Sequence, residues 1–134
     1  GAVAETSAEA VRRRCDLRGK LAGSFDDSLK GRYNFTCVTG NCQFAIIWLR
    51  LAQKTGDQRY ASTALKALQQ AVNAQAVRTP DPRFKGAIPG SNPLWGRYMA
   101  LRYPNWAAKF FVDATMVADA HIERLMEEGP CESL

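Results

Sequence analysis

The fold is decided by residues 41–75, NCQFAIIWLRLAQKTGDQRYASTALKALQQAVNAQ. In the first part of this stretch, apolar residues recur three and four positions apart, as on one face of a helix; they are Phe44, Ala45, Trp48, Leu49 and Ala52. Three further apolar residues widen the stripe, Ile46, Ile47 and Leu51. The pattern therefore predicts a largely buried helix that starts near Gly40 or Asn41, with Asn41 as its candidate N-terminal cap.

A tight turn follows this helix. Gly56 suits a helix end, and Asp57 suits the cap of a second helix over residues 58–75. One face of that helix is predicted to carry the apolar residues Ala61, Leu65, Leu68 and Val72. Beside it runs a strip of small residues that permits close helix approach, Ala64, Ala67 and Ala71. A helix, a Gly-Asp turn and another helix predict an antiparallel helical hairpin.

Two further helices are predicted on either side of the hairpin. The first starts at Thr6 or Ser7, because Thr6 and Glu9 fit a capping box, and it stops at Gly19 or Gly23. The last starts at Pro104. Its apolar stripe is Trp106, Phe110, Ala114 and Val117. No stretch reads as a convincing strand, so the sequence predicts an all-α domain of antiparallel helical hairpins over residues 1–134, with a long ordered loop.

Composition narrows the class of protein. The chain has 134 residues, of which 46% are hydrophobic, enough for one domain with a core. Its longest apolar run, residues 44–49, is far shorter than the ~20 residues of a membrane-spanning helix, so no span is expected. Residues 1–4 lack the basic start of a signal peptide, which favours a cytoplasmic location.

The cysteines give no cofactor signature. Cys15, Cys37, Cys42 and Cys131 allow three disulfide pairings, and the gap between Cys37 and Cys42 is not the Cys-x-x-Cys spacing of redox or zinc sites. Free thiols are expected in a chain of this size, and a single disulfide is the alternative. No glycine-rich phosphate loop is found, and we expect neither a metal nor a cofactor.

The net charge of +5 is unevenly distributed along the chain. Residues 33–112 contain ten basic and two acidic residues, a net charge of +8, whereas residues 113–134 have a net charge of −5. A basic middle could attract an anionic partner. The alternative is that these Arg and Lys side chains only solvate helix faces. Nucleic acid is the weaker choice of partner, because no recognised binding motif accompanies the charge.

The strongest functional signal lies in residues 77–103. Four prolines and three glycines exclude a regular helix there, while several aromatic residues favour an ordered loop. Trp95 and Tyr98 could stack on sugar rings, and Arg97 could bind a carboxylate or phosphate. The alternative is that Trp95 and Tyr98 plug the helix ends.

Polar and amphipathic residues at predicted helix starts extend this candidate ligand site. They are Asn41, Gln43, Asn105 and Trp106. Helix starts on the same rim of a hairpin array converge, which would bring these four residues near the loop. Capping alone would also explain Asn41, and packing alone would explain Trp106.

Candidate catalytic residues are fewer. Asp113 lies in an otherwise apolar helix, where a buried acid could be a catalyst with a raised pKa or could pair with Lys109. Asp26 is the second candidate acid. The only histidine, His121, is expected on the surface of the acidic last helix.

Three stretches together resemble a known family. They are Thr39-Gly40-Asn41-Cys42-Gln43 with Trp48-Leu49 and Thr55-Gly56-Asp57; Gly86-Ala87-Ile88-Pro89-Gly90-Ser91 with Pro93-Leu94-Trp95-Gly96; and Pro104-Asn105-Trp106-Ala107-Ala108-Lys109-Phe110-Phe111. This pattern is similar to the C-terminal part of bacterial α/α-toroid proteins with helical repeats like those of prenyltransferases and squalene cyclases. Some of these proteins are associated with polysaccharide or cell-surface glycan metabolism.

The resemblance implies a partial α/α-toroid, because a closed toroid needs more hairpins than 134 residues can hold. The Asp-rich signature of a terpene cyclase is absent, so cyclase chemistry is not implied. The leading hypothesis is a glycan-related domain that binds a sugar-like or anionic ligand. Its rivals are a catalytic fragment of a lyase, hydrolase or cyclase-like enzyme, and a scaffold that docks to another helical domain or to a second copy.

Overall fold

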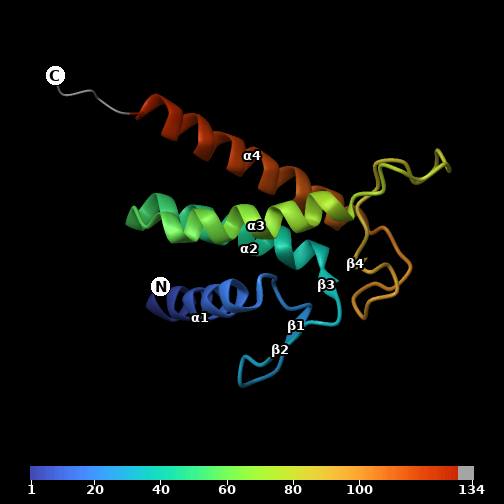
Figure 1. Cartoon of the computed structure of the whole chain (residues 1–134), viewed down its shortest axis with the longest axis horizontal. Coiled ribbons are helices and arrows are strands. Elements are labelled where there is room, and N and C mark those ends of the chain that lie inside the picture. Colours follow the sequence, from blue (N-terminus) through green and yellow to red (C-terminus); the bar gives the residue numbers. More distant parts are fainter. Residues whose placement is uncertain (130–134) are drawn as a thin grey trace.

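The computed structural model describes residues 1–129. In chain order its elements are α1 (Ala2–Arg18), β1 (Ser24–Phe25), β2 (Gly31–Arg32), β3 (Thr36–Cys37), α2 (Val38–Thr55), α3 (Gln58–Ala74), β4 (Ser91–Asn92) and α4 (Asn105–Glu127). The antiparallel pair α2 and α3 lies at the centre, with α1 on one side and α4 on the other (Figure 1). The helical class is therefore confirmed. The strands are two-residue pairs, β1 with β2 and β3 with β4, which the sequence did not predict.

The turn between α2 and α3 forms as predicted. Gly56 adopts a left-handed conformation with φ 74°, which favours glycine, and its N–H donates to the Ala52 carbonyl at 2.9 Å. Asp57 then caps α3 by accepting a hydrogen bond from the Arg59 N–H at 3.0 Å. The hairpin is thus specified locally by two adjacent residues.

The predicted start of α2 is wrong. The helix begins at Val38, and Cys37 is its cap, with Sγ accepting from the Gly40 N–H at 3.3 Å. Asn41 lies inside the helix and is fully buried. Its amide nitrogen donates to the Ala67 carbonyl of α3 at 3.0 Å. Because β3 leads directly into the helix, a thiol takes the cap position and Asn41 joins two helices instead.

The strip of small residues on α3 lies at the helix contact, as predicted, but only part of the predicted apolar face is buried. The strip of small residues faces the core, together with Ala61, Thr63 and Leu68, whereas Leu65 and Val72 are exposed. Ala64, Ala67 and Ala71 are completely buried. Small side chains let the backbones of α2 and α3 approach closely. The helix contact is therefore made by alanines, and the larger side chains of Leu65 and Val72 remain exposed.

The first helix starts earlier than the capping box predicts. It begins at Ala2, and the hydroxyl of Thr6 donates to the Ala2 carbonyl within the helix at 2.9 Å. Glu9 pairs with Arg12 and Arg13 and caps nothing. The predicted end is confirmed, since Gly19 adopts φ 70°.

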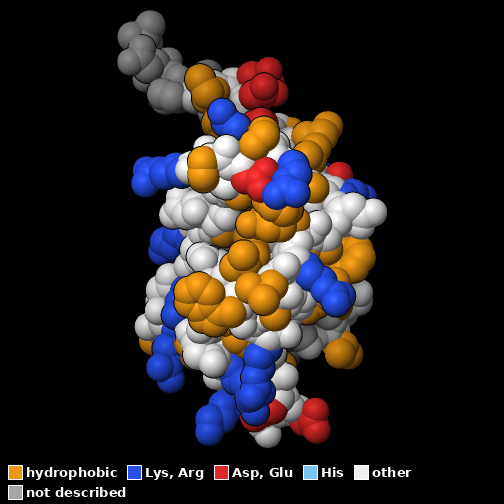
Figure 2. Space-filling view, turned by 90° about the vertical axis from the view of Figure 1, so that its right-hand side faces the viewer, with side chains coloured by type: hydrophobic (Ala, Val, Ile, Leu, Met, Phe, Trp, Pro, Cys, Tyr) orange, Lys and Arg blue, Asp and Glu red, His pale blue; other side chains and the backbone are white. Residues whose placement is uncertain are grey.

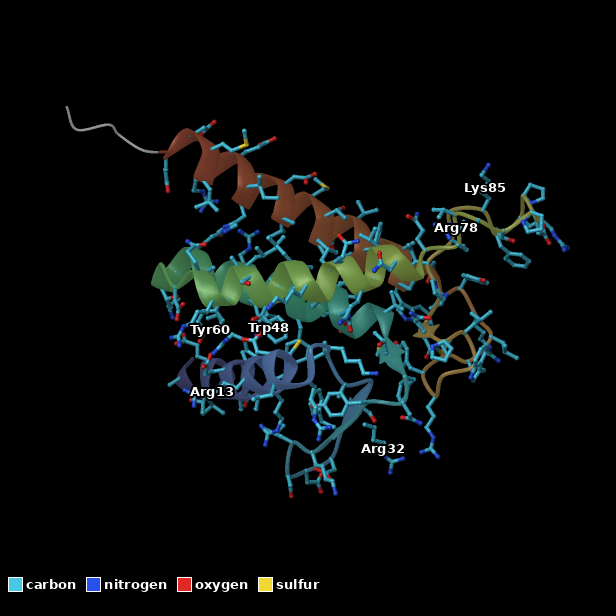
Figure 3. The ribbon with its side chains drawn as sticks, in the orientation of Figure 1. Arg13, Arg32, Trp48, Tyr60, Arg78 and Lys85 are labelled. Carbon is cyan, nitrogen blue, oxygen red and sulfur yellow. The ribbon has the colours of Figure 1, made fainter. Side chains whose placement is uncertain are left out.

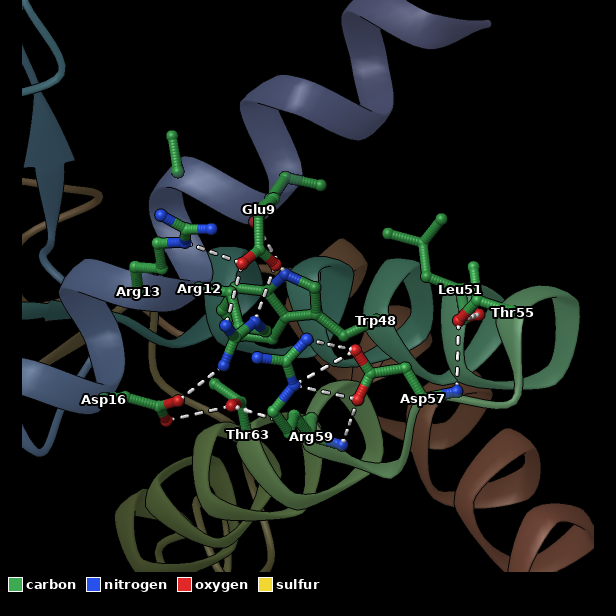
Figure 4. Close-up of polar contacts among 12 residues, drawn as sticks. Glu9, Arg12, Arg13, Asp16, Trp48, Leu51, Thr55, Asp57, Arg59 and Thr63 are labelled. Carbon is green, nitrogen blue, oxygen red and sulfur yellow. Dashed lines mark hydrogen bonds and ion pairs between the residues drawn. The ribbon is translucent and has the colours of Figure 1, made fainter.

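A polar network attaches α1 to the hairpin (Figure 4). Arg12 is only 5% exposed and contacts Glu9 at 2.8 Å and Asp16 at 2.7 Å. The hydroxyl of Thr63 in α3 donates to the other oxygen of Asp16 at 2.9 Å. On α2, the indole N–H of Trp48 donates to the Ala8 carbonyl at 3.0 Å. Figure 3 shows Trp48 in this position, between α2 and α1.

The last helix is attached differently. Its buried residues are Ala107, Ala114, Ala118 and His121. The expectation of a surface histidine is wrong, because His121 is 4% exposed and neither ring nitrogen has a hydrogen-bond partner. The three alanines belong to the predicted stripe of Trp106, Phe110, Ala114 and Val117 or to the residues that widen it, Ala107, Phe111 and Ala118, whereas Trp106 is 42% exposed. As on α3, small residues occupy the closest helix contact.

Cys15, Cys37 and Cys42 are free thiols, and Cys131 lies outside the described residues. Burial raises the pKa of the Cys42 thiol to about 12 and that of Cys15 to about 11, so both stay protonated near neutral pH. None of the helices within residues 1–129 has the length and apolar character needed to cross a membrane.

Candidate functional site at the loop end

The long loop packs across one end of the helices. The starts of α2 and α4 and the end of α3 meet there (Figure 1), as predicted for helix starts on one rim. The Val38 N–H at the start of α2 donates to the Gly90 carbonyl, and the Gly90 N–H donates to the Arg102 carbonyl, both at 3.0 Å. Pairing of β3 with β4 adds a further attachment. These bonds give the loop a defined structure.

The loop has two parts. Its tip, residues 77–86, is closed at the base by hydrogen bonds between Ala76 and residues 86 and 87, at 2.9 and 3.0 Å. Arg78 and Lys85 lie on this projecting tip (Figure 3). In the second part, the Ser91 hydroxyl binds the backbone of Tyr98, accepting from its N–H at 3.1 Å. The second part is therefore fixed against the helix ends, and the tip extends from it.

One predicted ligand residue of the loop, Tyr98, contacts the start of α4. Trp95 is 74% exposed, and Arg97, two residues further along the loop, is exposed as well. The indole N–H of Trp106 donates to the Tyr98 hydroxyl at 3.1 Å, so two aromatic side chains from different elements are joined at the surface. Asn105 is exposed next to them. Trp95 therefore does not plug a helix end.

The two predicted residues of α2 behave differently. Gln43 is exposed on the helix surface. Asn41 is enclosed, and besides Ala67 its amide nitrogen contacts Gln70 Oε1 at 2.9 Å. Its own carbonyl oxygen has no hydrogen-bond partner. In this structure Asn41 organises neighbouring side chains and does not reach the surface.

The loop end is basic. Arg83 pairs with Asp81 at 2.7 Å, but Arg78, Lys85, Arg97 and Arg102 have no carboxylate within ion-pair distance among residues 1–129. Figure 2, which looks onto this end, shows apolar and basic side chains among other polar side chains and backbone, with few acidic ones.

The candidate catalytic acids are engaged in the fold and lie apart. Asp113 forms an ion pair with Lys109, the structural alternative considered from the sequence. Asp26 accepts hydrogen bonds from the N–H groups of Ser28 at 3.0 Å and Lys30 at 2.8 Å, which shapes the β1–β2 turn. That turn and α4 lie on opposite sides of the central hairpin (Figure 1). The two carboxylates therefore do not form the pair, roughly 5–10 Å apart, that glycoside hydrolysis requires.

Two hollows were not predicted from the sequence. The larger, of about 810 Å³, runs along the outer side of α1 and is bordered by Tyr60, and its carboxylates already bind cations, Glu5 to Lys54 and Glu9 to Arg12. The smaller, of about 330 Å³, lies between β3, β4 and the last turns of α3. Its polar residues come from separate segments, so no local motif could indicate it.

Neither a metal-binding group nor a similar known protein indicates a function for the described chain. Within the described part of the chain, no group of three or more His, Cys, Asp or Glu side chains is placed to hold a metal ion. Comparison with known proteins gives no match: no family model fits the chain, and no curated protein or solved structure is similar to it.

Proposed function

We propose that this domain binds a sugar-like, anionic ligand on the loop end of the helices, with Trp95 and Arg97 as its main contacts. The observation that carries this proposal is the exposure of Trp95, 74%, on a loop that hydrogen bonds hold in place. An exposed indole on a backbone that is held in place offers a ligand a flat apolar surface at a defined position on the molecule.

The surroundings of Trp95 support the same ligand class. Arg97 and Arg102 have guanidinium groups with no acidic partner in the described chain, so they are available for a carboxylate or phosphate. The bonded pair of Tyr98 and Trp106 adds a second aromatic surface with polar edges. A stacking surface next to a cation matches an acidic saccharide better than an apolar ligand.

The wider arrangement is part of the proposal. The resemblance to α/α-toroid proteins suggests that these hairpins belong to a partial toroid-like array in a glycan-related protein. The position of the loop across neighbouring helix ends supports this idea, because such an array would place its ligand at one rim. The resemblance alone connects the chain with glycans, so binding itself has to be measured.

The test uses a hexamer of an acidic sugar, oligogalacturonate, and a neutral hexamer, maltohexaose. We expect isothermal titration to show binding of the acidic hexamer and at least tenfold weaker binding by Trp95→Ala and by Arg97→Ala. Arg78→Ala, on the projecting tip, is the matched control and should bind almost as well as the original chain. If Trp95→Ala binds the hexamer unchanged, this proposal is wrong.

Docking is a second candidate function. Val112 and Met116 are exposed one turn apart on α4, and Met126 is exposed on the same helix. Apolar side chains on a helix face away from the core can contact a second copy or a further helical repeat. Light scattering tests self-association, which Met116→Glu should abolish. If the original chain is a monomer at 100 μM and the variant has the same size, self-association through this helix face is excluded.

A further inference from the structure

The smaller hollow is a cavity between four separate segments, and it lies next to the loop end. Its polar lining comes from the segment that follows α1, from β3 and the residues before it, from the last turns of α3 and from strand β4. These side chains are Lys20, Asn34, Thr36, Gln70, Asn73 and Asn92. At about 330 Å³ the cavity is at the lower end of the ~300–1,000 Å³ range of small-molecule sites.

Most polar groups in this lining have no partner within the fold. Lys20 makes no ion pair, and the side chains of Asn34 and Asn92 make no hydrogen bond, among residues 1–129. Asn73 uses only its oxygen, which accepts from Gln69 at 2.9 Å, so its two N–H donors are free. Thr36 is only 9% exposed, yet it also borders the cavity. Such groups are available for a ligand.

The remaining polar side chain is held in place from behind. Gln70 accepts from the buried Asn41 at 2.9 Å and donates to the Gly19 carbonyl at 3.1 Å. These two bonds connect α2, α3 and the end of α1, and they fix the orientation of the Gln70 amide. A preorganised wall lowers the entropy cost of binding.

The cavity also has an apolar wall. Phe35 and Pro93 form part of its lining, and Phe35 is buried. Two glycines make room for Phe35: a Cβ on Gly23 would lie 2.5 Å from its ring, and a Cβ on Gly96 would lie 2.9 Å from its Cβ. The ring therefore occupies a place that any larger neighbour would disturb. Apolar ring faces are what the C–H surface of a sugar packs against.

The chemistry of the lining selects a ligand class. Carboxamides both donate and accept hydrogen bonds, as a ring of hydroxyl groups requires. Lys20 provides one positive charge, and no carboxylate lines the cavity to neutralise it. We infer that this cavity binds one monosaccharide unit that bears a single carboxylate, a hexuronate, with Lys20 on the carboxylate and the amides on the hydroxyls. This deepens the proposed function and rests on it, since it assigns one acidic sugar unit to a defined pocket.

The experiment measures monosaccharide binding by NMR titration of the whole chain with glucuronate, glucose and glucose 6-phosphate. We expect glucuronate to bind and to shift the amide signals of β3, β4 and the last turns of α3. Lys20→Gln should weaken glucuronate binding at least tenfold and remove its preference over glucose. Asn73→Leu should weaken both sugars, because it removes hydroxyl contacts and leaves the charge. Lys30→Gln, an exposed lysine on the β1–β2 turn, is the matched control.

Other outcomes overturn the inference. If glucose binds as tightly as glucuronate, Lys20 is not the partner of the carboxylate. If glucose 6-phosphate binds more tightly than glucuronate, the preferred ligand is not a sugar with a single carboxylate. Absent binding, or binding unaffected by Lys20→Gln and Asn73→Leu, would exclude the pocket. Circular dichroism of each variant separates these results from unfolding. The proposed function fails on a different readout, the effect of Trp95→Ala on the acidic hexamer, so the two failures are distinguishable.

Discussion

Helices α1 and α4 cover opposite sides of the same hairpin, but they are attached by different physical means. On the α1 side, the buried guanidinium of Arg12 contacts two carboxylates, and Asp16 continues the network to Thr63. On the α4 side, the buried residues are three alanines and a histidine without partners. One attachment depends on charge and direction, and the other depends on the close approach of two backbones.

This difference indicates how each side should fail. A polar network is sensitive to the loss of one member, because the groups that it bound lose an ion pair or a hydrogen bond while they remain partly buried. A contact between small residues is sensitive to added volume, because neighbouring backbones leave no space for it. Four changes test this contrast, two on each helix, taken from the largest expected effect to the smallest.

The largest effect is expected for Arg12→Met. It keeps much of the side-chain volume but leaves Glu9 and Asp16 without their buried cation, which should cost about 3 kcal/mol of unfolding free energy. Urea denaturation measures the loss, and hydrogen exchange should increase in α1 more than in α4. Arg13→Met removes an exposed arginine from the same Glu9 and should cost under about 1 kcal/mol. Equal losses in the two variants would contradict the role of the buried network.

On the other side, Ala114→Leu should cost about 2 kcal/mol. Ala114 is completely buried where α4 packs on the hairpin, so the larger side chain must displace a helix. Thermal unfolding and hydrogen exchange in α4 measure this effect. Ala120→Leu, an exposed position on the same helix, should change stability by less than about 0.5 kcal/mol. A loss at position 120 as large as that at position 114 would argue against tight alanine packing.

Stability on the α1 side should also depend on pH. Hydrogen bonds from Arg12, with a further one from Arg13, lower the pKa of Glu9 to about 2. Because the folded pKa lies below the unfolded value, the stabilisation is complete above about pH 4.5 and is lost as the pH falls towards 2. Discounted for solvent screening, we expect a loss of about 1 kcal/mol. The unfolding free energies of the original chain and of Glu9→Gln are measured at pH 6 and at pH 2.5. The difference between the two chains should be smaller at pH 2.5, and an equal difference at both pH values would refute the prediction.

The smallest effect is expected for Lys109→Met. Its partner Asp113 lies four residues along the exposed surface of α4, and such pairs contribute about 0.3–0.5 kcal/mol. Unfolding in 0.05 M and 0.5 M salt should show that even this small difference nearly disappears at the higher concentration. A loss above 1 kcal/mol would indicate that Asp113 has a structural role that its exposure does not suggest.

The local parts of this fold could be predicted from the sequence, and the long-range parts could not. Gly56 and Asp57 specify their turn through their own backbone and side chain, so the end of α2 and the start of α3 were predicted correctly. Asn41 has the same cap-forming chemistry, but a residue of α3 offered it a buried partner 26 positions away. His121 looked like a surface residue because its neighbours in the sequence are acidic, and its burial depends on which face of α4 meets the hairpin.

The candidate site shows the same division. Trp95, Arg97 and Tyr98 stand close together in the sequence, so composition of the loop was enough to nominate them. The position of Trp106 near this loop was predicted from helix starts on a common rim, but its hydrogen bond to Tyr98 was not predicted. The polar cavity was missed, because Lys20, Gln70 and Asn92 share no motif or spacing.

By itself, then, the sequence determined the helical class, the central hairpin with its turn, and the basic, aromatic loop, because caps, periodicity and composition act within a few residues. The tertiary structure decided which helix faces are buried and that polar side chains from four segments surround one cavity. These features depend on how closely whole helices approach, and that distance is set by all the side chains between them at once.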